Sequence, residues 1–86
     1  MKEWQVYLLK CADRSLYCGI TNDLPARVDT HNTGRGAKYT RGRLPVVLVA
    51  QSREMTKSQA LKCEIAIKQL PAQKKITALA FQEAFE

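Results

Sequence analysis

The alternation of apolar and polar residues along the chain predicts three strands. Residues 4–11 (WQVYLLKC) place apolar or aromatic side chains at both alternating sets of positions, which is typical of a strand covered on both faces. The turn ADRS follows, and residues 15–20 (SLYCGI) return as the second strand of a hairpin. The branched run at residues 45–50 (PVVLVA) is the clearest strand pattern and predicts the third strand.

Capping signals predict where the helices begin and end. A first helix begins after Asn22 or Asp23, which are good cap residues, and it ends after Asn32, where two glycines follow. A Gly- and Arg-rich loop is predicted over residues 33–44.

Two further helices are predicted in the second half of the chain. Thr56 and Gln59 form a capping box that begins one of them, and Pro71 ends it. The last helix covers residues 72–85. Its inward face is predicted to consist of Ile76, Leu79, Ala80 and Phe85.

These elements follow in the order β-β-α-β-α-α. The order predicts an α/β or α+β sandwich, in which a small three-stranded antiparallel sheet is flanked by helices. The 86 residues contain no repeat, low-complexity tract or linker, so one domain over residues 1–86 is expected.

Positive charge is concentrated in one part of the chain. Fourteen Lys and Arg against eight Asp and Glu give a net charge of +6. Five basic residues fall within residues 27–43, where Asp29 alone opposes them: Arg27, Arg35, Lys38, Arg41 and Arg43. This concentration favours phosphate, and hence nucleic acid, as the partner.

Cysteine usage and hydropathy indicate the compartment. Cys11, Cys18 and Cys63 have no C-x-x-C spacing, so neither a disulfide framework nor a zinc knuckle is indicated, and the three are expected to be buried apolar residues. The amino terminus has no signal-peptide pattern, and no apolar run approaches roughly 18 residues. A cytoplasmic protein that does not bind membranes is therefore expected.

Arg27 and His31 lie side by side on the first predicted helix. Leu24 and Val28 define the apolar stripe of this helix, and the two polar residues lie immediately beside it. They could line a cleft at the edge of the sheet. The alternative is a structural role, in which the arginine stem covers apolar surface and the histidine caps a carbonyl.

Glu64 falls within the apolar arc of the second helix. One flank of that arc consists of Ala60, Cys63, Ile67 and Leu70, and the other of Leu61 and Ile65. A buried carboxylate needs a partner, because an unpaired buried charge costs several kcal/mol. Lys68, four residues later, is a structural partner, whereas a hard divalent cation such as Mg²⁺ is a functional one. Both alternatives are open.

Tyr7 and Tyr17 are expected to lie on the same face of the sheet. A hairpin loop with an odd number of residues would place them so, whereas a two-residue turn would place them on opposite faces. Gly19, inside the second strand, indicates a close backbone approach at that point, with a bulge as the alternative.

Taken together, these residues resemble the GIY-YIG endonuclease superfamily. The resemblance rests on VYLL around Tyr7, LYCGIT around Tyr17 and KYTRG around Tyr39, together with Arg27, His31 and Glu64, and it covers roughly residues 4–79. In particular, the chain resembles the compact stand-alone bacterial branch, which is related to the catalytic subunit of the eukaryotic structure-specific flap and junction nuclease. Neither name-giving tripeptide is intact, since VYL and YCG stand in their places, but both tyrosines are kept.

The resemblance implies a catalytic site and its metal. The implied catalytic residues are Tyr7, Tyr17, Arg27, His31 and Glu64, with Glu64 holding a single Mg²⁺ or Mn²⁺. Arg27 would stabilise charge on the scissile phosphate, and the metal would steady the departing 3′ oxygen. Either a tyrosine, with Tyr7 named first, or His31 would take the proton of the attacking water.

The implied activity is that of a metal-dependent endonuclease acting on branched, flapped or single-stranded DNA, in DNA repair or nucleic-acid processing. RNA stays open as a substrate. The residues expected to contact nucleic acid are Gly19, Arg35, Lys38, Tyr39, Arg41, Arg43 and Lys68. Homing and excision-repair members of the superfamily carry a catalytic Asn near the carboxy terminus, and this chain has no Asn after Glu64.

Two other functions fit the composition. One is a catalytically weak or inactive nucleic-acid-binding module recruited by a protein partner, and the other is a small basic protein bound to ribosomal RNA. The retained catalytic set favours the nuclease, because a protein that only binds phosphate has no use for a carboxylate such as Glu64 facing it.

Overall fold

The computed structural model describes residues 3–80, in which three strands form one antiparallel sheet. The strands are β1 (Gln5–Lys10), β2 (Leu16–Thr21) and β3 (Val47–Gln51), arranged in the order β2-β1-β3. β1 pairs with both neighbours, so β2 and β3 are the two edges. The predicted antiparallel sheet is confirmed, although β3 begins two residues later than predicted.

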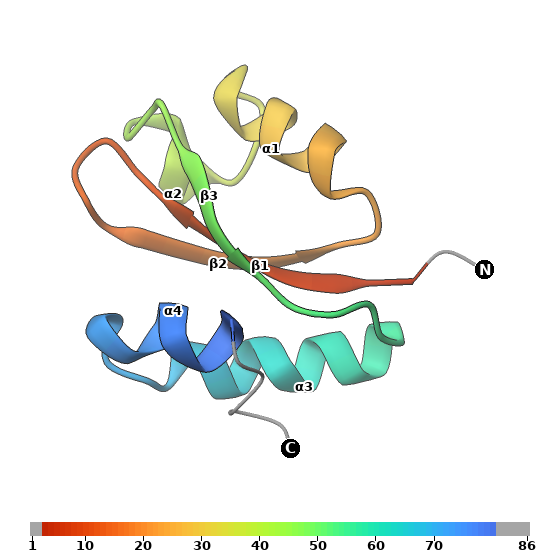
Figure 1. The fold of residues 1–86 in the computed structure, drawn as a ribbon. Helices are drawn as coiled ribbons and strands as arrows, with labels where there is room; N and C mark the ends of the chain where they lie inside the picture. The colour runs from red at the N-terminus through yellow and green to blue at the C-terminus, as the bar shows by residue number, and fades with distance from the viewer. Residues whose placement is uncertain (1–2, 81–86) are drawn as a thin grey trace.

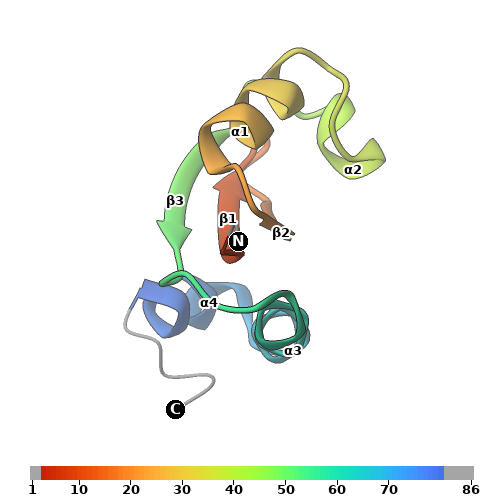
Figure 2. The same cartoon turned by 90° about the vertical axis from the view of Figure 1, so that its right-hand side faces the viewer.

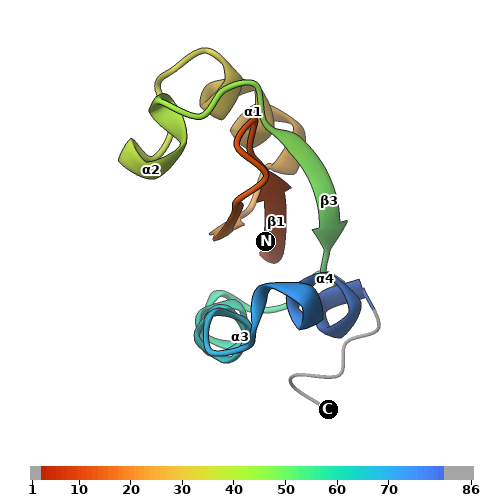
Figure 3. The same cartoon turned by 90° about the vertical axis from the view of Figure 1, so that its left-hand side faces the viewer.

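Helices cover both faces of the sheet. One face carries α1 (Leu24–Asn32) and α2 (Lys38–Arg41), and the other carries α3 (Lys57–Lys68) and α4 (Ala72–Ala80), as Figure 1 shows. In Figures 2 and 3, α2 and α3 lie toward the β2 edge of the sheet, whereas α4 lies under β3. The helical layers can therefore approach each other around the β2 edge.

The predicted α+β fold and element order are confirmed, with one addition. The predicted loop over residues 33–44 contains α2, a helix of four residues without a side-chain cap. A helix this short has almost no local signal, because stable helices need several turns of their own hydrogen bonds. Its presence is decided by tertiary contacts.

The two apolar cores lie on opposite faces of β1. Val6 and Leu8 face α3 and α4, and Leu9 belongs with Leu24 to the cluster on the α1 side. Since Val6, Leu8 and Leu9 have no exposed surface, the prediction of a strand covered on both faces is confirmed.

Local cap signals gave the right helix starts. Asp23 is the N-cap of α1, and Thr56 with Gln59 forms both hydrogen bonds of the predicted capping box at α3. Asn32, at the end of α1, exchanges two hydrogen bonds with the backbone of Val46, which fixes the end of this helix against the segment before β3.

Some predicted inward-facing residues are exposed instead. Leu61 and Ile65 of α3 are 43% and 58% exposed, and only the flank with Ala60, Cys63 and Ile67 is buried. In α4, Leu79 is buried as predicted, but Ile76 and Ala80 are exposed. The error arose because each helix contacts the sheet along one narrow stripe, while both sequences are apolar over a wider arc. Phe85 lies outside the described residues.

The cysteines are buried and free, as predicted for Cys11, Cys18 and Cys63. Within residues 3–80, no group of three or more His, Cys, Asp or Glu side chains could hold a metal ion. No helix in the same range is long and apolar enough to cross a membrane.

Candidate active site

Three aromatic rings meet on the α1 face of the sheet. The ring centroids of Tyr7 and Tyr17 are 6.3 Å apart, and His31 lies 5.9 Å from the first and 5.2 Å from the second. The hairpin loop spans residues 11–15, an odd number, and pairs Lys10 with Leu16. The prediction that both tyrosines share a face is therefore confirmed.

Tyr7 lies at the centre of a hydrogen-bonded chain. Arg27 Nε donates to the Tyr7 hydroxyl at 3.3 Å, and that hydroxyl lies 3.0 Å from His31 Nε2. The other ring nitrogen, Nδ1, lies 2.9 Å from Thr40 Oγ1. Residues from β1, α1 and α2 are thus linked through Tyr7 and His31.

His31 is fully buried, which differs from its expected place at the border of the apolar stripe. The reason is the segment that follows α1. Thr40 lies against the imidazole, and Gly36 packs so closely that a Cβ at residue 36 would collide with the ring. Gly36 therefore does more than end a helix, because its missing side chain makes room for His31.

Gly19 makes the same kind of room for Tyr7, its cross-strand partner. A Cβ at residue 19 would lie 2.5 Å from the Tyr7 hydroxyl oxygen and 3.1 Å from Cε2 of Tyr17. The β1–β2 register is continuous here, so the close approach is confirmed and the bulge alternative is excluded. Gly19 is itself buried, which makes direct contact with DNA a less suitable role than support of the tyrosines.

Tyr39 extends the aromatic cluster outward from α2. Its ring stacks on Tyr17 with centroids 6.1 Å apart and an interplanar angle of 28°. The Arg43 guanidinium lies 4.1 Å from the Tyr39 centroid, while Arg43 Nε donates to Asp13 at 2.8 Å. Arg43, which was predicted to contact nucleic acid, is thus engaged in holding Tyr39 to the hairpin loop.

A cleft of about 250 Å³ opens at the β2 edge, beside this cluster. Its walls come from both helical layers, with Tyr39 from α2 on one side and Lys68 from α3 on the other. The lining residues are Leu16, Tyr17, Cys18, Tyr39, Lys68 and Lys75. Burial raises the pKa of Cys18 to about 12, so the cysteine is a neutral thiol and no nucleophile at neutral pH.

Glu64 reaches the same edge from α3. Its side chain is 19% exposed, and Oε2 lies 3.5 Å from the ammonium of Lys68, which lines the cleft. Glu64 is thus at the border of the buried stripe and not in its middle. The structural partner predicted for it is present, and that partner, Lys68, lines the cleft, whereas Glu64 itself is not one of its lining residues.

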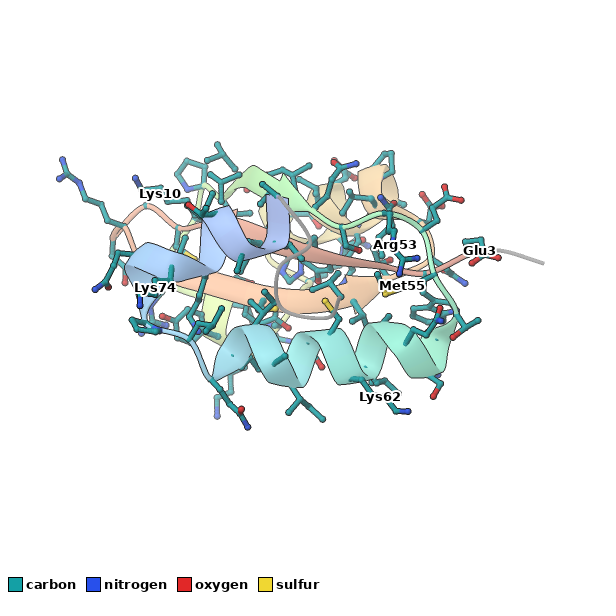
Figure 4. The ribbon with its side chains drawn as sticks, turned by 60° about the horizontal axis from the view of Figure 1, so that its bottom comes forward. Glu3, Lys10, Arg53, Met55, Lys62 and Lys74 are labelled. Carbon is teal, nitrogen blue, oxygen red and sulfur yellow. The ribbon has the colours of Figure 1, made fainter. Side chains whose placement is uncertain are left out.

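The basic residues are distributed over more of the surface than the sequence suggested. Arg35, Lys38 and Arg41 are exposed around α2, where Arg41 Nε donates to the carbonyl of Gly36. Figure 4 shows further basic residues on the α3–α4 side: Lys62 of α3, Lys74 of α4 and Arg53 of the segment between β3 and α3. A second depression, of about 160 Å³, lies between Arg53 and Lys62.

Comparison with known families decides the membership of the chain. The family model described as the GIY-YIG catalytic domain matches residues 3–77. The chain belongs to the GIY-YIG family. The predicted superfamily is therefore confirmed, whereas the relation to the eukaryotic flap and junction nuclease stays a prediction.

Similar proteins and solved structures agree with the GIY-YIG assignment. A UPF0213 protein of Oceanobacillus iheyensis is 49% identical over 91% of each chain, and one of Staphylococcus aureus is 55% identical over 83% of this chain and 87% of its own. The solution structure of a UPF0213 protein from Bacillus halodurans is 40% identical, with a TM-score of 0.55 over 93% of this chain and 85% of its own. A structure from E. faecalis is 35% identical, with a TM-score of 0.64 over 100% and 92%.

Burial decides the protonation states in the GIY-YIG cluster. It raises the pKa of Tyr7 to about 12, although the hydrogen bond from Arg27 acts in the opposite direction. Burial, and then the charge of Arg27, lower the pKa of His31 below its ordinary value. At neutral pH Tyr7 is therefore a phenol and His31 a neutral imidazole, which can accept a proton.

The donor set of this GIY-YIG chain fits a magnesium ion held by one carboxylate. Mg²⁺ usually binds proteins through one or two carboxylates and keeps several waters. Glu64 is a partly exposed carboxylate whose described ion-pair partner, Lys68, is a half-exposed lysine that lines the cleft. Lys75, by contrast, donates to the carbonyls of Ile67 and Lys68 and so closes the end of α3.

Sequence reasoning missed Thr40 and the supporting role of Gly36. Thr40 lies between Tyr39 and Arg41 in the segment KYTRG, in which those two neighbours were the predicted nucleic-acid contacts. The only available signal was a small polar residue nine positions after the histidine. That spacing does not indicate a contact, because Thr40 reaches His31 only once α2 has packed beside α1.

Proposed function

We propose that this GIY-YIG protein is a metal-dependent endonuclease that hydrolyses DNA phosphodiester bonds. The observation that carries the proposal is the hydrogen-bonded set of Arg27, Tyr7 and His31, which packs against Tyr17 beside a cleft that is also lined by Lys68, the ion-pair partner of Glu64. The family is described by its catalytic domain. In this chain Arg27 supplies a cation, His31 a proton acceptor and Glu64 a carboxylate for such a catalytic site.

Tyr7 and His31 act together as the base in this proposal. With a pKa of about 12, only about one Tyr7 in 10⁵ is ionised at pH 7, so the phenolate alone is a costly base. When Tyr7 takes a proton from water, its own proton can pass to His31 Nε2, 3.0 Å away. Both candidates named from the sequence thus contribute to one proton transfer.

Arg27 would bind the scissile phosphate and stabilise its negative charge. Its Nε is directed to Tyr7, and the terminal nitrogens of the guanidinium, one of which also interacts with Tyr17, would donate to the oxygens of a scissile phosphate. Glu64 would hold one Mg²⁺ or Mn²⁺, which when bound stabilises charge on the departing 3′ oxygen. Tyr17 packs against His31 and borders the cleft, and so it limits the access of bulk water.

A single strand suits the cleft better than an intact duplex. The cleft is small, and its lining combines tyrosine rings with lysine ammonium groups, as grooves that follow single-stranded nucleic acid do. Branched, flapped or single-stranded DNA is therefore the proposed substrate, with a role in DNA repair or nucleic-acid processing. Contacts of lysine and arginine with phosphate carry no base sequence and do not by themselves separate DNA from RNA, so RNA is the competing substrate to test.

The first experiment measures cleavage of labelled flap, Y-shaped and single-stranded DNA and RNA. Wild type is compared with Glu64→Gln in Mg²⁺, in Mn²⁺ and in chelator, and Glu54→Gln is the matched control because that carboxylate is exposed and lies outside α3. We expect metal-dependent cutting that is lost in Glu64→Gln, with DNA binding retained. Binding without cutting under every condition would refute the nuclease.

Arg27→Ala tests the phosphate role. We expect cleavage to fall at least about a hundredfold, while DNA affinity falls only a few-fold, because one ground-state contact is lost but a transition-state contact is lost with it. Affinity and cleavage rate are measured on the same substrate. Equal losses in both would assign Arg27 to binding alone.

The alternative is a nucleic-acid-binding module recruited by a protein partner. The specific observation in its favour is the Glu64–Lys68 ion pair, because it gives the carboxylate a structural partner without any metal. If this alternative holds, Glu64→Gln leaves DNA binding unchanged and divalent cations have no effect on the chain.

A further inference from the structure

The hydrogen bonds around His31 define where each proton lies. Thr40 Oγ1 lies 2.9 Å from the carbonyl of Ala37 and accepts or donates toward His31 Nδ1 at the same distance. A hydroxyl has one proton and the carbonyl can only accept, so the Thr40 proton belongs to the Ala37 contact. Nδ1 must then donate to Thr40.

Tyr7 leads to the same assignment from the opposite end. Its hydroxyl oxygen accepts from Arg27 Nε, which is always a donor. If His31 carried its proton on Nε2, the Tyr7 oxygen would accept twice, and none of its described contacts would take the Tyr7 proton. With the proton on Nδ1, every proton in the chain has an acceptor, from Arg27 through Tyr7, His31 and Thr40 to Ala37.

We propose that Thr40 is a positioning residue that holds His31 in the Nδ1-protonated tautomer and so presents Nε2 to Tyr7 as the proton acceptor. Thr40 is fully buried, so no water competes for Nδ1 from its side. The catalytic consequence rests on the proposed nuclease function, because only there does Tyr7 need to pass on a proton. The tautomer itself follows from the fold alone.

The fold holds this arrangement from four elements. Tyr7 of β1 and Tyr17 of β2 face the imidazole, Arg27 of α1 faces Tyr7, and Thr40 of α2 faces Nδ1. Gly36 packs against the Nδ1 edge of the ring, where a side chain at residue 36 would collide with it. Arg27 is the one charged group in this described set, and its charge further disfavours an imidazolium.

The chain has a single histidine, so its tautomer can be read directly. We would record the imidazole ¹⁵N resonances of uniformly labelled protein at neutral pH, without metal or DNA. We expect a proton on Nδ1 and none on Nε2 in the wild type. In Thr40→Val, which keeps the shape but removes the hydroxyl, Nδ1 loses its acceptor while the Tyr7 contact remains, so the share of the Nε2-protonated tautomer should rise measurably. Thr40→Ser, which keeps the hydroxyl, should retain the wild-type pattern.

Cleavage of flap DNA in Mg²⁺ is then measured with the same three proteins. We expect a loss of roughly tenfold to a hundredfold for Thr40→Val and recovery to within a few-fold for Thr40→Ser. A wild-type proton on Nε2, or an unchanged Nδ1 proton in Thr40→Val, would overturn the proposal. If the wild type shows the Nδ1 proton but cuts no DNA, the tautomer stands and the nuclease function fails. If Thr40→Val does not fold, the spectra of the wild type and Thr40→Ser still decide the tautomer.

Discussion

Single residues in this site are constrained by the space that their neighbours need. The Tyr7 hydroxyl is held between Arg27 and His31, and its ring crosses the backbone at Gly19. Gly42, at the end of α2, has open space where its Cβ would be and an ordinary backbone conformation. Substitution by alanine is therefore expected to have opposite outcomes at the two positions, harmful at Gly19 and neutral at Gly42.

Gly19→Ala should damage catalysis more than folding. The added methyl lies 2.7 Å from Tyr7 Cζ, and the phenol cannot retreat without breaking its hydrogen bonds. We expect cleavage to fall at least about tenfold and the free energy of unfolding to fall by about 1–3 kcal/mol. Gly42→Ala is the control and should leave both unchanged in the same nuclease and urea-unfolding assays. Normal cleavage by Gly19→Ala would show that the Tyr7 position is not needed.

The lowered pKa of His31 allows the pH dependence of the free energy of unfolding to be predicted. Its folded-state pKa lies below the unfolded value, so the unfolded chain takes up a proton first as the pH falls. The contribution of His31 to the free energy of unfolding is therefore fully present above about pH 6.5. Below that pH it decreases by at most about 1.4 kcal/mol per pH unit. Urea unfolding of wild type and His31→Gln between about pH 7.5 and about pH 5.5 tests this. A slope that persists in His31→Gln would assign the effect to other groups.

At the scale of elements, α2 and α3 are stabilised in different ways. α3 has a complete capping box and three turns of helix, so most of its definition is local. α2 has four residues and no side-chain cap, and contacts from other elements stabilise it, such as the link from Arg43 to Asp13. Both helices contribute to the cleft at the β2 edge, and one begins at its own capping box whereas the other depends on contacts with other elements.

Thr56→Ala tests the local contribution to α3. The substitution removes the hydroxyl that accepts from the Gln59 amide at 3.1 Å, and we expect a loss of about 1 kcal/mol in the free energy of unfolding. Ser58→Ala, within the first turn of the same helix, is the control and should be nearly neutral. Equal effects of the two substitutions in urea unfolding would mean that the cap contributes nothing.

At the scale of the molecule, both helical layers border the same edge of the sheet and contribute side chains to the cleft there. Tyr17 of the aromatic cluster and Lys68, the ion-pair partner of Glu64, both line the cleft beside β2. Figure 2 shows α2 and α3 on opposite faces of the sheet, both toward its β2 edge. Basic side chains surround this edge, but they also occur on the α3–α4 side (Figure 4). The net positive charge therefore supports binding to nucleic acid in general. Whether a given Lys or Arg contacts a strand in the cleft depends on where that side chain lies.

The salt dependence of DNA binding separates the two surfaces. If a strand follows the β2 edge, Lys38→Ala should reduce the slope of log affinity against log salt by about one phosphate contact, whereas Lys62→Ala, on the α3–α4 side, should leave it unchanged. Fluorescence anisotropy with labelled single-stranded DNA over a salt series measures both. A slope reduced by Lys62→Ala and not by Lys38→Ala would place the DNA on the α3–α4 face.

The sequence by itself determined the strands, the longer helices, the caps and the residue types of the site. These features depend on neighbours within a few positions, so their signals are local, as at Thr56 and Gln59. The identity of Tyr7, Tyr17, Arg27, His31 and Glu64 as one group came from resemblance to a family whose membership is now confirmed. Their roles in catalysis stay predictions until the assays above are made.

Only the tertiary structure decided which of these residues touch. The burial of His31, the part played by Thr40 and the ion pair of Glu64 depend on α2 and α3 packing against a sheet formed by distant segments. The widths of the buried stripes, which left Ile65 and Ile76 exposed, also depend on that packing. A local pattern states which side chains are apolar or polar, but the surface available to bury them exists only after the chain has closed on itself.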